Sequence, residues 1–110
     1  MATHFEEGAS TLRPPLFRGE NYTYWKARMI IHIKSIDRAI WNSIVNGPHV
    51  PKAIAGDVEI ELEESEWSTL DIKKVQIDDR AINILYCALD ANEFNRISSC
   101  ESAKEIWDKI

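Results

Sequence analysis

The residue types that could carry out acid–base or nucleophilic chemistry are few in this chain, and they lie far apart. Cys87 could act as a nucleophile with His32 as its base, because a thiol is activated by a neighbouring imidazole. Both residues lie in helix-like stretches. In such stretches a buried small thiol and a histidine at the edge of an apolar stripe are more common than a catalytic pair. His4 and His49 lie in segments without helical periodicity. These patterns indicate a chain that is not an enzyme.

The spacing of possible ligands does not support a metal or cofactor site. Zinc sites use close pairs of cysteines, whereas twelve residues separate Cys87 from Cys100. The acidic run from Asp57 to Glu66 lacks the glycine and the alternating ligands of a calcium-binding loop. The four glycines are isolated, so no phosphate-binding loop is present. We therefore expect no cofactor, no metal and no small-molecule substrate.

Length and composition are those of an ordinary soluble domain. The 110 residues suit one domain, and the fractions of 45% apolar and 28% charged residues are typical of globular proteins. No apolar run reaches membrane-spanning length and no signal peptide is evident, so we expect a cytoplasmic protein with reduced thiols. The net charge of −5 disfavours nucleic-acid binding by the domain as a whole, because such binding depends on neutralising phosphates.

Charge is distributed unevenly along the chain. Residues 11–40 carry six bases and two acids, whereas residues 57–66 carry six acids and no base. The simpler interpretation is a solvated basic helix face and a solvated acidic loop. The alternative is that the two patches attract each other head to tail between neighbouring subunits, in a contact that salt weakens.

Hydrophobic periodicity predicts an all-α bundle of about four to five helices at residues 14–110, behind a flexible tail at residues 1–13. The expected helices span 22–35, 38–46, about 68–89, 93–97 and 103–110. Residues 47–67 are expected to form a long acidic connection. Val58, Ile60 and Leu62 alternate with acids as in a strand, but no partner strand is evident, so we expect a loop there.

The stretch from Leu16 to Trp25 predicts how the first helix begins. The preceding prolines favour an extended strap at Leu16 and Phe17, which a glycine turn follows. Asn21 is expected to cap the helix by accepting a hydrogen bond with its side chain. The stretch favours a role in packing and assembly.

The helix at 68–89 is expected to lie at the centre of the bundle, because apolar residues cover most of its circumference. Its main apolar stripe consists of Val75, Ile82, Leu85, Tyr86 and Leu89. A second row on another side consists of Ile77, Ala81, Ile84 and Ala88.

For the last helix, Ser98 and Glu101 have the spacing of a reciprocal cap. The chain stops at Ile110 on an apolar stripe with no cap, so we expect the bundle to be incomplete at its carboxyl end.

Three blocks in series resemble the Gag polyproteins of copia-type LTR retrotransposons, especially those of plants. Residues 17–25 (FRGENYTYW) resemble the F-x-G-x-N-Y-x-x-W motif of these proteins. Residues 78–89 look like their central helix, and residues 94–108 resemble the segment that contains A-K-E-I-W-D. The order and spacing of the blocks agree over residues 14–110.

The resemblance implies a capsid-like helical domain that self-assembles into particles enclosing the RNA of the element. These proteins usually continue with further capsid helices and a zinc knuckle, neither of which is in this sequence, so contact with RNA would depend on that missing downstream knuckle. The resemblance assigns structural roles in the strap, cap and core to Phe17, Gly19, Asn21, Tyr22, Trp25, Ile106 and Trp107.

We expect self-association into a homo-oligomer, without a membrane. The interface candidates lie off the main stripes: Trp41, Trp67, Ile77 and Ile84. The same four side chains can instead simply close the small core. Two further interpretations stay open, namely a retroelement-derived host interaction adaptor and a nucleic-acid-binding module that uses the basic face of residues 13–38.

Overall fold

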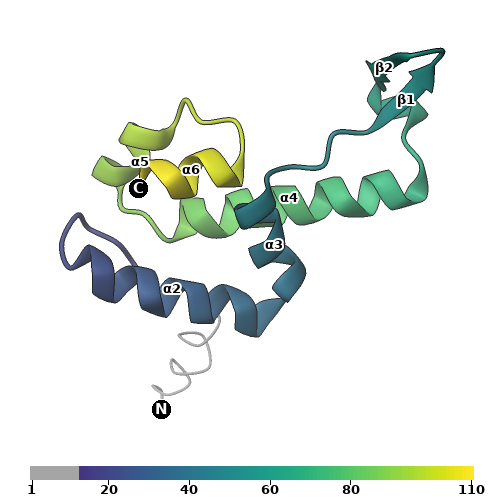
Figure 1. Cartoon of the computed structure of the whole chain (residues 1–110). Helices are drawn as coiled ribbons and strands as arrows, with labels where there is room; N and C mark the ends of the chain where they lie inside the picture. Colours follow the sequence, from purple (N-terminus) through teal and green to yellow (C-terminus); the bar gives the residue numbers. More distant parts are fainter. Residues whose placement is uncertain (1–12) are drawn as a thin grey trace.

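The computed structural model describes residues 13–110, so the tail expected at residues 1–13 lies, apart from Arg13, outside the described residues. Within that range the chain is mostly helical, with one small hairpin between the helices (Figure 1). The elements are α2 (Tyr22–Ile36), α3 (Arg38–Asn46), β1 (Lys52–Ala55), β2 (Val58–Glu61), the 3-10 turn η1 (Glu64–Glu66), α4 (Thr69–Cys87), α5 (Ala91–Ile97) and α6 (Ala103–Lys109).

The prediction of a helical fold is confirmed in its main part, but the described residues are not purely α-helical, because residues 52–61 form a β-hairpin rather than the expected loop. Antiparallel pairing sets Lys52 opposite Glu61 and Ala55 opposite Val58. The two strands are joined by a two-residue turn whose first residue, Gly56, has φ +68°, which glycine adopts without steric cost. The partner strand escaped notice because Lys52–Ala55 contains two alanines and shows no clear alternation of apolar and polar residues.

The expected strap before α2 is present and ties the start of the chain to the end of α4. The amide of Phe17 donates to the carbonyl of Ala88 at 2.7 Å, and the amide of Asp90 donates to the carbonyl of Phe17 at 3.2 Å. The indole Nε1 of Trp25 donates to the carbonyl of Pro15 at 2.8 Å. The rings of Phe17 and Trp25 are both buried, with centroids 5.0 Å apart. The strap therefore closes the core at this end of the bundle.

Asn21 occupies the cap position of α2, but its side chain does not cap the helix. Its backbone is left-handed, with φ 54° and ψ 47°, and its side chain makes no capping hydrogen bond. A capping side chain needs an extended backbone at this position, so the expected hydrogen bond was wrong. Asparagine suits the site because its short polar side chain tolerates the left-handed conformation.

Ser102 caps the last helix, whereas the sequence predicts a reciprocal cap four residues earlier, at Ser98. Ser102 Oγ accepts a hydrogen bond from the amide of Glu105 at 3.1 Å. Ser98 instead ends α5, whose buried Ile97 accepts a hydrogen bond at its carbonyl from the amide of Cys100. The chain must complete this turn before α6 can start, and this displaces the cap.

The core lies where α2, α3 and the carboxyl-terminal half of α4 meet α6 (Figure 1). Its buried apolar residues are Phe17, Trp25, Met29, Ile33, Ile40, Ile44, Ala81, Leu85, Ala88, Leu89, Ile97, Ala103 and Ile106. The innermost apolar residues of α4 are Ala81 and Leu85, and Ala88 continues their row at the position that ends the helix. These residues come from both rows expected from the sequence. The two alanines leave room for neighbouring helices, and α4 packs against both α3 and α6.

The strap provides a direct test of this packing. We expect Phe17→Ala to lower the free energy of unfolding by about 3–5 kcal/mol, because it removes a ring that is only 4% exposed. Leu16→Ala is the matched control, since Leu16 is 46% exposed, and it should cost about 1 kcal/mol or less. Urea denaturation measures both. Equal losses in the two variants would contradict the role of the strap.

Candidate functional site

The most distinctive surface is an arm, residues 50–67, that projects beyond the helical body. Figure 1 shows the hairpin at the far end of α4, away from α2, α5 and α6. The molecule measures 60 × 29 × 20 Å, and its radius of gyration of 16.7 Å exceeds the value of about 13 Å for a compact domain of this length. The arm therefore presents surface that the core does not use.

The hairpin of the arm has one apolar face and one charged face. Side chains of paired residues point to the same side, so Ala53, Ala55, Val58 and Ile60 share a face. The opposite face carries Lys52, Ile54, Glu59 and Glu61. All eight residues are exposed. An apolar sheet face left in water is typical of a surface that binds another protein.

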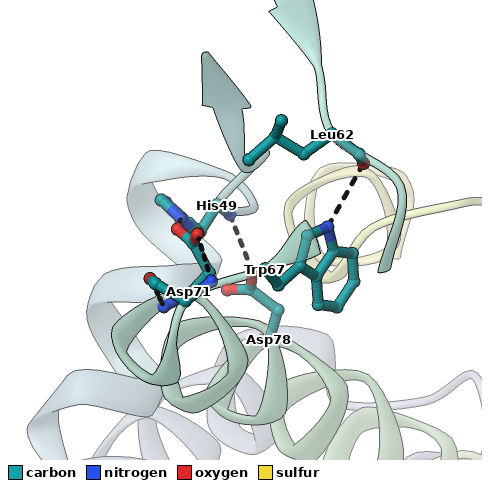
Figure 2. Close-up of polar contacts among 6 residues, drawn as sticks. His49, Leu62, Trp67, Asp71 and Asp78 are labelled. Atoms are coloured by element: carbon teal, nitrogen blue, oxygen red, sulfur yellow. Dashed lines mark hydrogen bonds and ion pairs between the residues drawn. The ribbon is translucent and has the colours of Figure 1, made fainter. Parts of the chain in front are cut away.

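A polar network fixes the segment that leads into the arm. His49 Nε2 lies 2.8 Å from Asp71 Oδ1, and the backbone amide of His49 donates to Asp78 Oδ2 at 2.7 Å. The second oxygen of the buried Asp78 carboxylate accepts from the hydroxyl of Ser43 on α3. Figure 2 shows the side chains of Asp71 and Asp78 on α4 reaching the same short segment. These contacts join α3, α4 and the start of the arm.

Hydrogen bonds within the arm close its two ends against each other. Trp67 Nε1 donates to the carbonyl of Leu62 at 3.2 Å (Figure 2), and the amide of Leu62 donates to the carbonyl of Pro51. Ser68 then caps α4 reciprocally with Asp71, close to the start expected from the sequence. The pKa of the Asp71 carboxyl is lowered, chiefly by its hydrogen bond with His49 and then by the Ser68 amide.

A groove lies where the arm returns to α4, and we call it the arm groove. Its volume is about 460 Å³, and its lining combines three apolar side chains, one amide and two carboxylates. The lining residues are Glu64, Trp67, Ile72, Val75, Gln76 and Asp79. Such a surface fits a partner that brings apolar side chains together with positive charge.

The four interface candidates from the sequence do not share one surface. Trp67 lines the arm groove, but Trp41, Ile77 and Ile84 are half-buried and pack against the core. The ring of Trp41 meets Trp107 edge-on, with centroids 5.4 Å apart. Their role as an interface stays a prediction.

The residues given structural roles by the resemblance gather around the strap and α6. Phe17, Trp25 and Ile106 are buried, while Trp107 is half-buried against Trp25. The other three lie at the start of α2 and are exposed: Gly19, Asn21 and Tyr22.

A second surface was missed by the sequence analysis. We call it the α2 outer face: Tyr24, Arg28 and Ile31, on the side of the helix opposite the core. Tyr24 is 65% exposed and Ile31 is 66% exposed, and the guanidinium Cζ of Arg28 lies 5.4 Å from the centroid of the Tyr24 ring. Spacings of four and three residues place the three side chains on one helical face, a signal that was present in the sequence.

The two residues considered for nucleophilic chemistry lie on different helices, and the buried Nε2 of His32 has no hydrogen-bond partner among the described residues. Cys87 is exposed at the end of α4, so the expectation of a buried thiol was wrong. It faces away from the row of Ala81, Leu85 and Ala88 that packs into the core. His32 is half-buried on α2, and this burial lowers its pKa because it disfavours the charged imidazolium.

Residues 13–110 contain no group of three histidine, cysteine or acidic side chains placed to hold a metal ion. Over the same residues, the structure has no helix whose length and apolar character would allow it to cross a membrane. Comparisons with protein-family models, curated proteins and solved structures find no match to this chain.

The buried carboxylate of Asp78 should control the position of the arm. We expect Asp78→Ala to lower the free energy of unfolding by about 1–3 kcal/mol, because the Ser43 hydroxyl and the His49 amide lose their acceptor. Amide hydrogen exchange at His49 should accelerate. Asp79→Ala, at the neighbouring exposed position, is the control. The same losses in both variants would count against the network.

The contact between Asp71 and His49 should make stability depend on pH at the acid end. Because folding lowers the pKa of Asp71 below its ordinary value of 3.8, its ionised form stabilises the fold above that pH, and this stabilisation is lost as pH falls through the lowered value. We expect Asp71→Asn to lower the urea midpoint at pH 6, and the difference between the two proteins to shrink as pH falls below 3.8. A difference that persists unchanged in acid would refute this assignment.

Proposed function

We propose that this chain is a non-enzymatic structural domain that self-associates, as the capsid-like part of a copia-type Gag polyprotein does. The observation that carries the proposal is the arm, whose apolar hairpin face is exposed while the segment that leads into it is anchored on Asp78 of α4 and its last residue, Trp67, is hydrogen-bonded to Leu62. Burying apolar surface contributes about 25 cal/mol per Å², so a second molecule gains free energy by covering this face. An anchored arm also loses little conformational entropy on binding.

The resemblance to Gag supports the same proposal. Its three blocks fall on the strap with the first turn of α2, on the carboxyl-terminal part of α4, and on α5 with α6. Side chains from these blocks meet in one core: Phe17, Leu85, Leu89 and Ile106 all belong to it. The arm lies between the first two blocks along the chain.

Assembly in this proposal works through many weak contacts. A particle holds each subunit by several neighbours at once, so a modest affinity for each contact is sufficient. The resemblance also implies that RNA is packaged. That step would use a zinc knuckle downstream of residue 110.

One observation favours a competing function. The α2 outer face exposes Tyr24 beside Arg28, and an exposed aromatic ring next to an arginine can stack on an unpaired base. A nucleic-acid-binding module of this kind predicts RNA binding by this chain alone, with an affinity that falls steeply as salt rises. The net charge of −5 weighs against it.

Sedimentation velocity tests the proposal. We expect the weight-average sedimentation coefficient to rise over about a hundredfold range of protein concentration, and the Val58→Thr/Ile60→Thr variant to associate at least about tenfold more weakly. Threonine keeps the β-branched shape of the strand and removes apolar surface. Val45→Thr changes an exposed valine on α3 and is the matched control.

Two results would overturn the proposal. One is a wild-type protein that stays monomeric over the whole concentration range. The other is steeply salt-dependent binding of single-stranded RNA by a monomeric protein, which would establish the nucleic-acid-binding alternative instead.

A further inference from the structure

The arm and the α2 outer face have opposite charge. Residues 57–66 in the arm carry six acids and no base, and two of the carboxylates around the arm groove, Glu64 and Asp79, are exposed. The α2 outer face carries Arg28, and Arg18 lies close to it in a depression lined by both arginines, Tyr24 and one carboxylate, that of Glu20. The charges of the two surfaces are therefore complementary, acidic on the arm and basic beside the α2 outer face.

The two surfaces cannot meet within one molecule. Figure 1 shows the hairpin and η1 at one extreme of the molecule, whereas α2 lies along the opposite side of the body. The core and the strap hold α2 in place through the buried side chains of Trp25, Met29 and Ile33. Contact between the surfaces therefore requires a second copy of the chain.

The side chains of the two surfaces also match in kind. The arm groove combines the apolar Trp67, Ile72 and Val75 with carboxylates. The α2 outer face combines an apolar residue at each end, Tyr24 and Ile31, with Arg28 between them. A helix that presents residues at these spacings to an apolar groove is a recurrent mode of recognition. None of the three side chains has to leave the core to take part, because all are exposed.

We propose that the α2 outer face of one copy docks into the arm groove of a second copy. Tyr24 and Ile31 contact the apolar lining, and Arg28 pairs with Glu64 and Asp79. This inference rests on the proposed self-association and adds a second contact to the one that the hairpin face makes.

The contact is heterologous, because it joins two different surfaces. In a docked pair, one copy keeps its arm groove free and the other copy keeps its α2 outer face free. Repetition therefore extends the assembly into a ring or an open chain. Because charge pairs at the edge of an interface are screened by ions, raising the salt concentration weakens the contact.

Charge reversal on either surface tests the docking. The groove variant is Glu64→Lys/Asp79→Lys, and the face variant is Arg28→Glu. We expect each variant alone to associate at least about tenfold more weakly than the wild type, because like charges then face each other. Sedimentation velocity measures the association, and circular dichroism checks that each variant is folded. The control is Glu101→Lys/Asp108→Lys, which reverses two exposed acids outside both surfaces.

Mixing the two variants separates docking from damage to the fold. In an equimolar mixture, the lysines of one variant face the glutamate of the other, and the native arginine and carboxylates form the alternate contact. Association should return to within about threefold of the wild type, and the chain that carries all three changes should also recover.

The outcomes distinguish this inference from the proposed function. The docking is overturned if the wild type associates but the variants behave like the control, or if the mixture does not recover. Either result leaves self-association standing. A wild type that remains monomeric overturns both.

Discussion

The buried carboxylate of Asp78 joins the two parts of this molecule, and the placement of the arm depends on it. A charged group taken out of water is tolerated only when its oxygens are hydrogen-bonded. Here one oxygen accepts from Ser43 on α3 and the other from the backbone of His49, where the chain leaves for the arm. The need to satisfy a single carboxylate thus orients α3 against α4 and sets the direction in which the hairpin projects.

The two halves of helix α4 lie in different parts of the molecule, one in the helical core and the other beside the arm. Its carboxyl-terminal half is held in the core by Ala81, Leu85 and Ala88, and the strap at Phe17 closes that end. Its amino-terminal half extends past the body, where Leu70 and Ile72 remain exposed. A helix apolar over most of its circumference, as the sequence indicated, is therefore covered by the core over only part of its length. The remainder becomes surface available to a partner.

These features make the molecule directional, with an acidic and apolar arm at one end and a basic and aromatic helix face on the opposite side. Directional subunits favour contacts that repeat, which agrees with the proposed self-association. Local sequence patterns anticipated much of this architecture. The apolar stripes located α2 and α3, and α4 begins close to the start expected near residue 68. The uneven charge was also visible in the sequence, and it is the property that distinguishes the two surfaces.

By itself, then, the sequence determined where helices form, because helical periodicity acts between residues three or four positions apart. Only the tertiary structure decided which strand pairs with Val58–Glu61, which row of α4 enters the core and that Cys87 faces outward. Each of these depends on packing between separate elements. The burial of Asp78 belongs to the same class, since its two partners lie 35 and 29 residues away along the chain. Contacts over such distances leave no periodic pattern in the sequence.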